Sequence, residues 1–406
     1  MAQQHLDPTD PTAEAVTGDA LAGYLRAQAT EFLRALRLRR ETGGNGAGAG
    51  ARGHAATGSA QASVDAARAL RRSARRISGS LHTFRPLLDP DWSEEMRPEL
   101  AWLSGTLGLE HAYEARLDRL LLALHRLSGS TAFPAQTVTA AAAAPVDVTA
   151  GGRAAATAGG GDTATAVTAG GRAAGAAPVP LKAAPGTGGP AGRTAAPERG
   201  NLTVGAAKAG ALLERQLTLA RTRAHSTALQ ALGSSRFHAV ADKVAVLASE
   251  VPLTPTAPGT DLRPLAAAAQ ERLTDAVAAL PLVTAGHPYN AEALVHGLSP
   301  EPSPHPQDGP WHQVRLLLRL HRYAREVLHG GEAHADVRLL TSGQALNRHR
   351  DASEAAAAAA QAARTPRITP ATAYALGVLH ADQRHEVEAA RFAFQQAWQR
   401  QTVDAP

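Results

Sequence analysis

Apolar residues recur along much of this chain at intervals of three to four, the spacing of a helix that buries one face. In residues 20–40, for example, Leu21, Leu25, Ala29, Phe32 and Leu36 follow this interval. The pattern predicts an all-α protein. The expected helices cover residues 20–40, 63–81, 91–108, 109–127, 204–232, 235–251, 261–280, 290–298, 310–328, 335–364 and 370–400.

The breaks between these patterns predict where helices begin. Residues 1–19 are expected to form a disordered tail, with Asp19 as the cap of the first helix. The glycine-rich stretch 43–60 is expected to be a loop. Ser63 then predicts a helix start, which would place Asp65 in the first turn, where a carboxylate complements the helix dipole.

Composition changes abruptly in the middle of the chain. Residues 132–201 are mostly Ala, Gly, Thr and Pro, and the sequence VTAGGRAA occurs at both 148–155 and 167–174. Such a segment cannot bury enough apolar surface to offset the entropy of ordering it. We therefore predict a low-complexity, disordered linker over 132–201 between a first helical half, 20–131, and a second, 202–406.

One predicted helix, 310–328, carries a stripe of basic side chains. At about 100° per residue, His312, Arg315, Arg319 and Arg322 fall within a sector of roughly 80°. Pro310 fits the first position of this helix. The stripe therefore points in one direction.

The first half contains the same interval in residues 63–81. Arg68, Arg72 and Arg75 repeat the spacing of the later stripe, and Arg71 flanks them, as does Arg76. A row of arginines on one helix face is often only its solvated side. Here, however, no Asp or Glu occurs between residues 66 and 83 or between 311 and 325. Stripes without neutralising acids favour a polyanionic partner.

The spacing in 310–328 resembles the signature of the CHAD (conserved histidine α-helical) domain family, a helix with His, then Arg, a basic pair, a further Arg and Tyr. His312, Arg315, Arg319, Arg322 and Tyr323 occupy these positions, and Leu320 stands for one member of the basic pair. The family has this signature twice in each domain.

The first copy departs further from the family. Arg68, Arg72 and Arg75 match it, whereas Ser73 replaces a basic residue and Asp65 stands at the histidine position. Residues 84–108, 346–352 (with Asp351) and 376–398 also resemble family segments, but Ala112 lies where an Arg-Asp-x-Asp run is usual. The resemblance covers most of residues 20–130 and 204–400.

The resemblance implies an internal duplication, which the repeated stripe also suggests: two related antiparallel helical bundles with a basic groove between them. It further implies non-catalytic binding of inorganic polyphosphate or a similar linear polyanion, and association with polyphosphate granules. No cofactor, metal or catalytic residue is expected. The expected binding residues are Arg68, Arg71, Arg72, Arg75, His312, Arg315, Arg319, Arg322 and Tyr323.

Two other functions remain open at this point. A nucleic-acid-binding protein would use the same stripes, although aromatic side chains for base stacking are sparse beside them, Tyr323 being the nearest. A helical scaffold for another protein is the second alternative, because Asp65, Ser73, Ala112 and Leu320 could mark an anion site that has decayed. A phosphate-cleaving enzyme is disfavoured, since no clustered carboxylates are present to hold Mg²⁺.

Composition adds a few constraints. The 406 residues carry a formal net charge of +5, and 38 of the 41 basic residues are Arg. With no Cys, disulfides and thiolate sites are excluded. The N-terminus lacks the features of a signal peptide, and no apolar run is long enough to span a membrane. We therefore expect a cytoplasmic protein, and we expect Trp92, Trp102 and Tyr113 to pack in the core.

Overall fold

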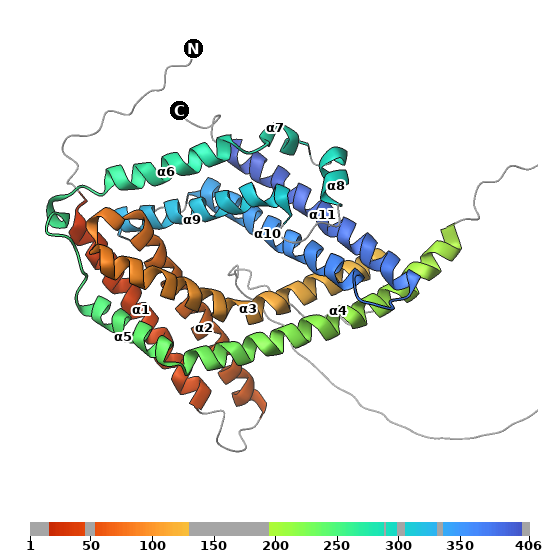
Figure 1. The fold of residues 1–406 in the computed structure, drawn as a ribbon, viewed down its shortest axis with the longest axis horizontal. Helices are drawn as coiled ribbons and strands as arrows, with labels where there is room; N and C mark the ends of the chain where they lie inside the picture. Colours follow the sequence, from red (N-terminus) through yellow and green to blue (C-terminus); the bar gives the residue numbers. More distant parts are fainter. Residues whose placement is uncertain are drawn as a thin grey trace, which may run out of the picture. The chain divides into compact units, whose positions relative to one another are not determined.

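A computed structural model describes residues 16–44, 53–129, 195–287, 290–298, 305–330 and 336–399, and within these ranges it shows helices and no strand (Figure 1). The protein is therefore all-α. The helices are α1 (Gly18–Gly44), α2 (Gly53–Thr83), α3 (Pro90–Ser128), α4 (Ala195–Leu232), α5 (Ser235–Ser249), α6 (Arg263–Ala278), α7 (Leu282–Ala285), α8 (Ala291–Gly297), α9 (Gly309–Leu328), α10 (Val337–Ala363) and α11 (Pro370–Gln399).

The second helix begins earlier than the sequence pattern indicates. α1 continues to Gly44 and α2 begins at Gly53, so the predicted glycine-rich loop 43–60 is wrong at both ends. Of this stretch, residues 45–52 lie outside the described part of the chain. Ser63 is an interior residue of α2 rather than its cap. Asp65 consequently does not act on a helix dipole; its carboxylate forms an ion pair with Arg68 at 3.0 Å.

The predicted helices 91–108 and 109–127 are one continuous helix, α3. Its start is as expected from local chemistry, because the Asp89 side chain accepts a hydrogen bond from the Trp92 amide at 2.8 Å and Pro90 occupies the first turn. The helix ends at Gly129, whose φ of 65° is the left-handed conformation common after a helix. Gly108, which suggested a boundary, lies inside α3.

The linker and tail predictions fall largely on residues outside the described ranges. This holds for 1–15 and for 130–194. α4 begins at Ala195, however, so the last residues of the predicted linker 132–201 are helical. The remaining helices of the second half begin and end close to their predicted residues, and the short helix α7 was not predicted.

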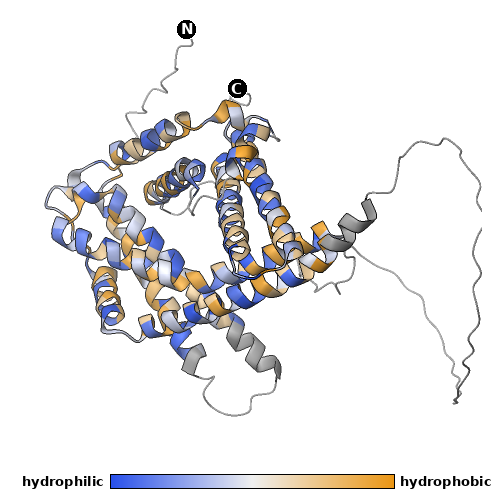
Figure 2. Ribbon diagram, turned by 45° about the vertical axis from the view of Figure 1, so that its right-hand side comes forward, coloured by the Kyte–Doolittle hydropathy of each residue, from blue (hydrophilic) through white to orange (hydrophobic). Residues whose placement is uncertain are grey.

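The two halves of the chain share their cores. One core cluster combines residues of α1, α2 and α3 with residues of α5 and with Ala324 and Val327 of α9. A second joins the C-terminal part of α3 to α4, α10 and α11, and a third joins α6, α9, α10 and α11. Trp92, Trp102 and Tyr113 pack against the first two clusters, which confirms them as packing residues. Most helices carry both hydrophobic and hydrophilic residues, as expected of helices that bury one face in a core (Figure 2).

Two connections across the halves position the basic helices. α2 of the first half packs against α9 of the second. Nearby, the segment after α2 pairs with the segment after α5, since Leu88 and Leu253 form an isolated β-bridge and the Thr254 amide donates to the Leu87 carbonyl at 3.0 Å. The two predicted stripes thus lie on helices in direct contact.

Within the described ranges, none of the helices combines the length and the apolar character that crossing a membrane requires.

Candidate functional site

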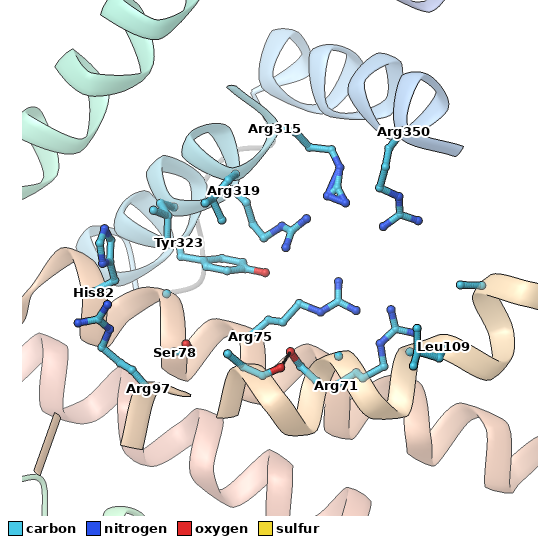
Figure 3. A pocket seen from close by; sticks show the side chains of 18 of the residues that line it. Arg71, Arg75, Ser78, His82, Arg97, Leu109, Arg315, Arg319, Tyr323 and Arg350 are labelled. Atoms are coloured by element: carbon cyan, nitrogen blue, oxygen red, sulfur yellow. Dashed lines mark hydrogen bonds between the residues drawn. The ribbon is translucent and has the colours of Figure 1, made fainter. Parts of the chain in front are cut away.

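The helices α2, α3, α9 and α10 enclose two adjoining cavities. Cavity A, of about 580 Å³, is lined mainly by α2, α3 and α9. Cavity B, of about 470 Å³, is lined mainly by α2, α9 and α10. Both linings include Arg71, Arg75, Arg315, Arg319 and Tyr323. We call these four arginines the inner arginines; Figure 3 shows their guanidinium groups reaching into the space between the helices.

Helical spacing and two glycines bring the inner arginines together. The arginines of α2 are four residues apart, as are those of α9, so each pair projects from one face. The helices approach closely at Gly79, where an added Cβ would lie 2.6 Å from Cδ2 of Tyr323. On α3, an added Cβ at Gly108 would lie 3.0 Å from Cζ of Arg71. Glycine at these two positions therefore leaves room for side chains of the site.

The inner arginines are not neutralised. Their guanidinium groups form no ion pair with any described carboxylate, and the buried Nε atoms of Arg71 and Arg315 have no hydrogen-bond partner. All four side chains are half-buried. A half-buried cation without a partner is unfavourable, because it loses hydration without gaining a counter-charge.

The pKa values of these groups reflect this strain. Burial, together with the charges of Arg319 and Arg350, lowers the pKa of Arg315 from the usual arginine value to about 9. Burial and the charge of Arg71 lower the pKa of Arg75 to about 10. The pKa values of Arg71 and Arg319 are lowered as well, first by burial and then by neighbouring arginines. An anion placed among these guanidinium groups would offset both the loss of hydration on burial and the repulsion between neighbouring arginines.

The other predicted arginines form the outer part of cavity B. Arg68 and Arg72 are exposed, and both line this cavity. Arg322 also lines it and lies 3.5 Å from the carboxylate of Glu326. The same carboxylate accepts a hydrogen bond from Arg76 Nε at 2.7 Å. Glu326 follows directly after the acid-free interval and neutralises part of the stripe.

Tyr323 lies at the junction of the two cavities and is buried. The guanidinium of Arg322 lies 5.4 Å from its ring centroid and that of Arg76 lies 5.9 Å from it. Tyr323 therefore fixes these two cations beside the inner arginines.

His312 is the one predicted binding residue that the structure places elsewhere. It lines neither cavity; its ring contacts that of His349 at a centroid distance of 5.4 Å, and its Nε2 lies 3.4 Å from Ser353 Oγ. Burial lowers its pKa, so the imidazole is neutral at neutral pH. The reason is positional: His312 lies in the first turn of α9, where the helix packs on α10 rather than on α2.

A buried polar network continues from His312. Asp308, almost fully buried, accepts hydrogen bonds from Arg384 Nη1 and from Arg391 Nη2, each at 2.8 Å. Burial opposes its charge, but its bonds to His349 and Arg384 outweigh this and hold the pKa of Asp308 below its usual value. Arg391 is also paired with Glu388 at 2.7 Å. This network joins α9, α10 and α11.

Sequence reasoning missed several charged side chains of cavity A. Arg350 of α10 and Arg116 of α3 line it, as does Glu354, which forms ion pairs with both arginines. Arg350 also pairs with Asp351 at 2.7 Å. Arg350 lies within 346–352, a segment that resembles the family, but neither this resemblance nor the spacing of the segment singled out Arg350.

The positions that depart from the family pattern have different surroundings. Ser73 is buried and donates a hydrogen bond to the Ala69 carbonyl, so it faces the core. Leu320 and Ala112 both line cavity A. These two substitutions therefore make one cavity more apolar, without removing any inner arginine.

The chain is similar to known proteins in sequence and in structure. The family model described as the CHAD domain matches residues 51–360. Among solved structures, the chain is similar to PptA from Streptomyces chartreusis, with 62% sequence identity and a TM-score of 0.67, over 95% of this chain and 100% of that one. The curated proteins contain no match.

Proposed function

Because the chain belongs to the CHAD domain family, we propose that it binds inorganic polyphosphate or a similar linear polyanion through the inner arginines. The observation that carries this proposal is the set of half-buried guanidinium groups at the junction of two cavities, none of which forms an ion pair with a carboxylate of the described residues. Arginine suits this ligand, because its planar guanidinium donates two parallel hydrogen bonds to phosphate oxygens.

A linear ligand fits the arrangement better than a single phosphate. The inner arginines line both cavities, and Arg68, Arg72 and Arg322 extend the positive surface of cavity B. Successive phosphates of one chain would therefore meet successive arginines. Each contact releases counterions, so the affinity should fall steeply with salt.

We propose binding without cleavage. Hydrolysis of a phosphoanhydride commonly requires carboxylates that hold Mg²⁺ and position a nucleophile. Of the described residues lining the two cavities, only Glu354 carries a carboxylate, and it is paired with arginines. We also propose that the protein acts in the cytoplasm, at polyphosphate granules.

The proposal is tested by calorimetric titration of the full chain with long-chain polyphosphate at about 50 mM and about 200 mM salt. With the four inner arginines engaged, the logarithm of the association constant should fall with the logarithm of salt concentration with a slope of about −3, by analogy with single-stranded nucleic acids. Single-stranded DNA of matched charge serves as competitor. If DNA displaces polyphosphate at equal phosphate concentration, the nucleic-acid function is favoured instead.

The variant Arg319→Gln should weaken polyphosphate binding by at least about tenfold, because a hydrogen bond to a charged group contributes about 1.5–3 kcal/mol. The matched control is Arg325→Gln on the same helix, since Arg325 is paired with Asp336 at 2.9 Å and lines neither cavity. Equal losses in the two variants would contradict a specific site. Absence of binding at low salt would leave the helical scaffold as the remaining function.

A further inference from the structure

Cavity A is not built like a site for phosphate alone. Leu109 of α3 and Leu316 of α9 line it, and their exposed fractions are 44% and 45%. Neither lines cavity B. Exposed leucines beside a cluster of guanidinium groups contribute nothing to binding an inorganic phosphate chain, whereas they would favour an apolar group on the same ligand.

A half-buried aromatic ring and a guanidinium group also line this cavity. Tyr113 lines cavity A, and the guanidinium of Arg116 lies 5.4 Å from the Tyr113 ring centroid. Flat aromatic bases stack on tyrosine rings and on arginine planes. Gly105 of α3, which also lines the cavity, leaves open space, since an added Cβ would have no neighbour within 4 Å.

Cavity A also contains acceptors and donors for hydroxyl groups. Glu354 is the one carboxylate among its described lining residues, and Ser78 and Ser104 add hydroxyls. A carboxylate repels phosphate, but it accepts hydrogen bonds from the vicinal hydroxyls of a ribose. Glu354 forms ion pairs with Arg116 and Arg350, and the acceptor positions that these pairs leave open suit a sugar hydroxyl and not a further phosphate.

The inner arginines connect this lining to the phosphate site, because they belong to both cavities (Figure 3). We propose that the site accepts a nucleoside polyphosphate, with the nucleoside in cavity A and the phosphates on the inner arginines toward cavity B. The volume of about 580 Å³ is sufficient for a nucleoside in the range usual for ligand pockets. This inference rests on the proposed anion site and specifies the ligand it recognises.

The test compares ATP with inorganic tripolyphosphate, which carries the same number of phosphate groups, by calorimetry in buffer with EDTA. ATP should bind about tenfold more tightly, the gain expected from stacking one base. In the double variant Leu109→Ser/Leu316→Ser, which removes the apolar contact and keeps Tyr113, ATP should lose more affinity than tripolyphosphate, whose binding should change less than about twofold. The matched control is Leu38→Ser, which alters a leucine that is 43% exposed and lines neither cavity, so it should leave ATP binding unchanged.

Several results would overturn the inference. These are equal or weaker binding of ATP compared with tripolyphosphate, and an equal loss of ATP binding in the Leu38→Ser control. A third is a tighter binding of geranyl diphosphate over inorganic diphosphate by a larger factor than that of ATP over tripolyphosphate, which would indicate a lipid-like partner. Long-chain polyphosphate, titrated in parallel, separates the two proposals. If it binds but ATP has no advantage, only the nucleoside inference fails; if no phosphate compound binds, the anion site itself fails.

Discussion

Removal of one inner arginine should stabilise the empty protein. Arg315 forms no ion pair with a carboxylate in the part of the chain that the structure describes, and burial with neighbouring cations lowers its pKa from the usual arginine value to about 9. At 1.36 kcal/mol per pKa unit, this difference corresponds to about 5 kcal/mol that disfavours the charged form in the folded state. The actual cost is smaller, because the flexible side chain can turn toward solvent, where its charge is screened. We therefore expect Arg315→Met, which removes this cost, to raise the free energy of unfolding by about 1–3 kcal/mol.

The assay is urea denaturation in a buffer of low ionic strength without multivalent anions. Added salt at about 0.5 M should reduce the gain, because it screens the repulsion among the remaining arginines. The same variant should bind polyphosphate at least about tenfold more weakly. Stability and affinity would then change in opposite directions, as expected of a charge retained for function.

The control is Arg325→Met on the same helix. Arg325 is paired with Asp336, so its loss leaves a partly buried carboxylate alone and should lower the free energy of unfolding by about 1–2 kcal/mol. If Arg315→Met destabilises the empty protein as much as this control, the inner arginines are not strained and the reasoning fails.

Three further predictions follow from other contacts. Glu326→Gln should lower the free energy of unfolding by about 2 kcal/mol in urea denaturation, since it leaves two cations unpaired; an effect below about 0.5 kcal/mol would contradict this. Burial lowers the pKa of His349 from 6.5 to about 4, so the neutral ring stabilises the fold above pH 6.5 and this stability is lost as pH falls toward 4. The loss should reach about 3 kcal/mol and be smaller in His349→Gln; identical pH profiles would exclude His349 as its source. Gly79→Ala should destabilise by about 1–3 kcal/mol through its clash with Tyr323, whereas Gly105→Ala should be neutral or stabilising; thermal unfolding distinguishes them, and a neutral Gly79→Ala would show that the helices can separate freely.

Features that depend on local geometry were predictable from the sequence. The spacing of Arg315 and Arg319 fixes their common direction on any helix, and the arginines of α2 follow the same rule. The family resemblance then indicated that the two helices face each other. The all-α fold and most helix ends in the second half required only apolar periodicity and caps.

Features that depend on contacts between distant segments were not predictable in this way. Ser63 has the chemistry of a cap, yet α2 continues N-terminal to it for several turns. α3 likewise continues through Gly108, where the glycine leaves room for Arg71 of the neighbouring helix. His312 belongs to the stripe by spacing alone; the packing of α9 on α10 turns it toward His349. Arg350 and Glu354 come from a helix without any basic repeat, so no pattern in the sequence assigns them to cavity A.

The alanines of α10 determine how much variation the site can tolerate. Ala355, Ala356, Ala359 and Ala362 are buried, and three of them share a core cluster with Leu376 of α11. Small side chains let two helices lie close, and a larger one would push them apart. Since Arg350 and Glu354 precede Ala359 and Ala362 on the same helix by five to twelve residues, bulk added at these two alanines would shift the charged groups of cavity A. Sequence drift in this interface would therefore tune binding without touching a binding residue.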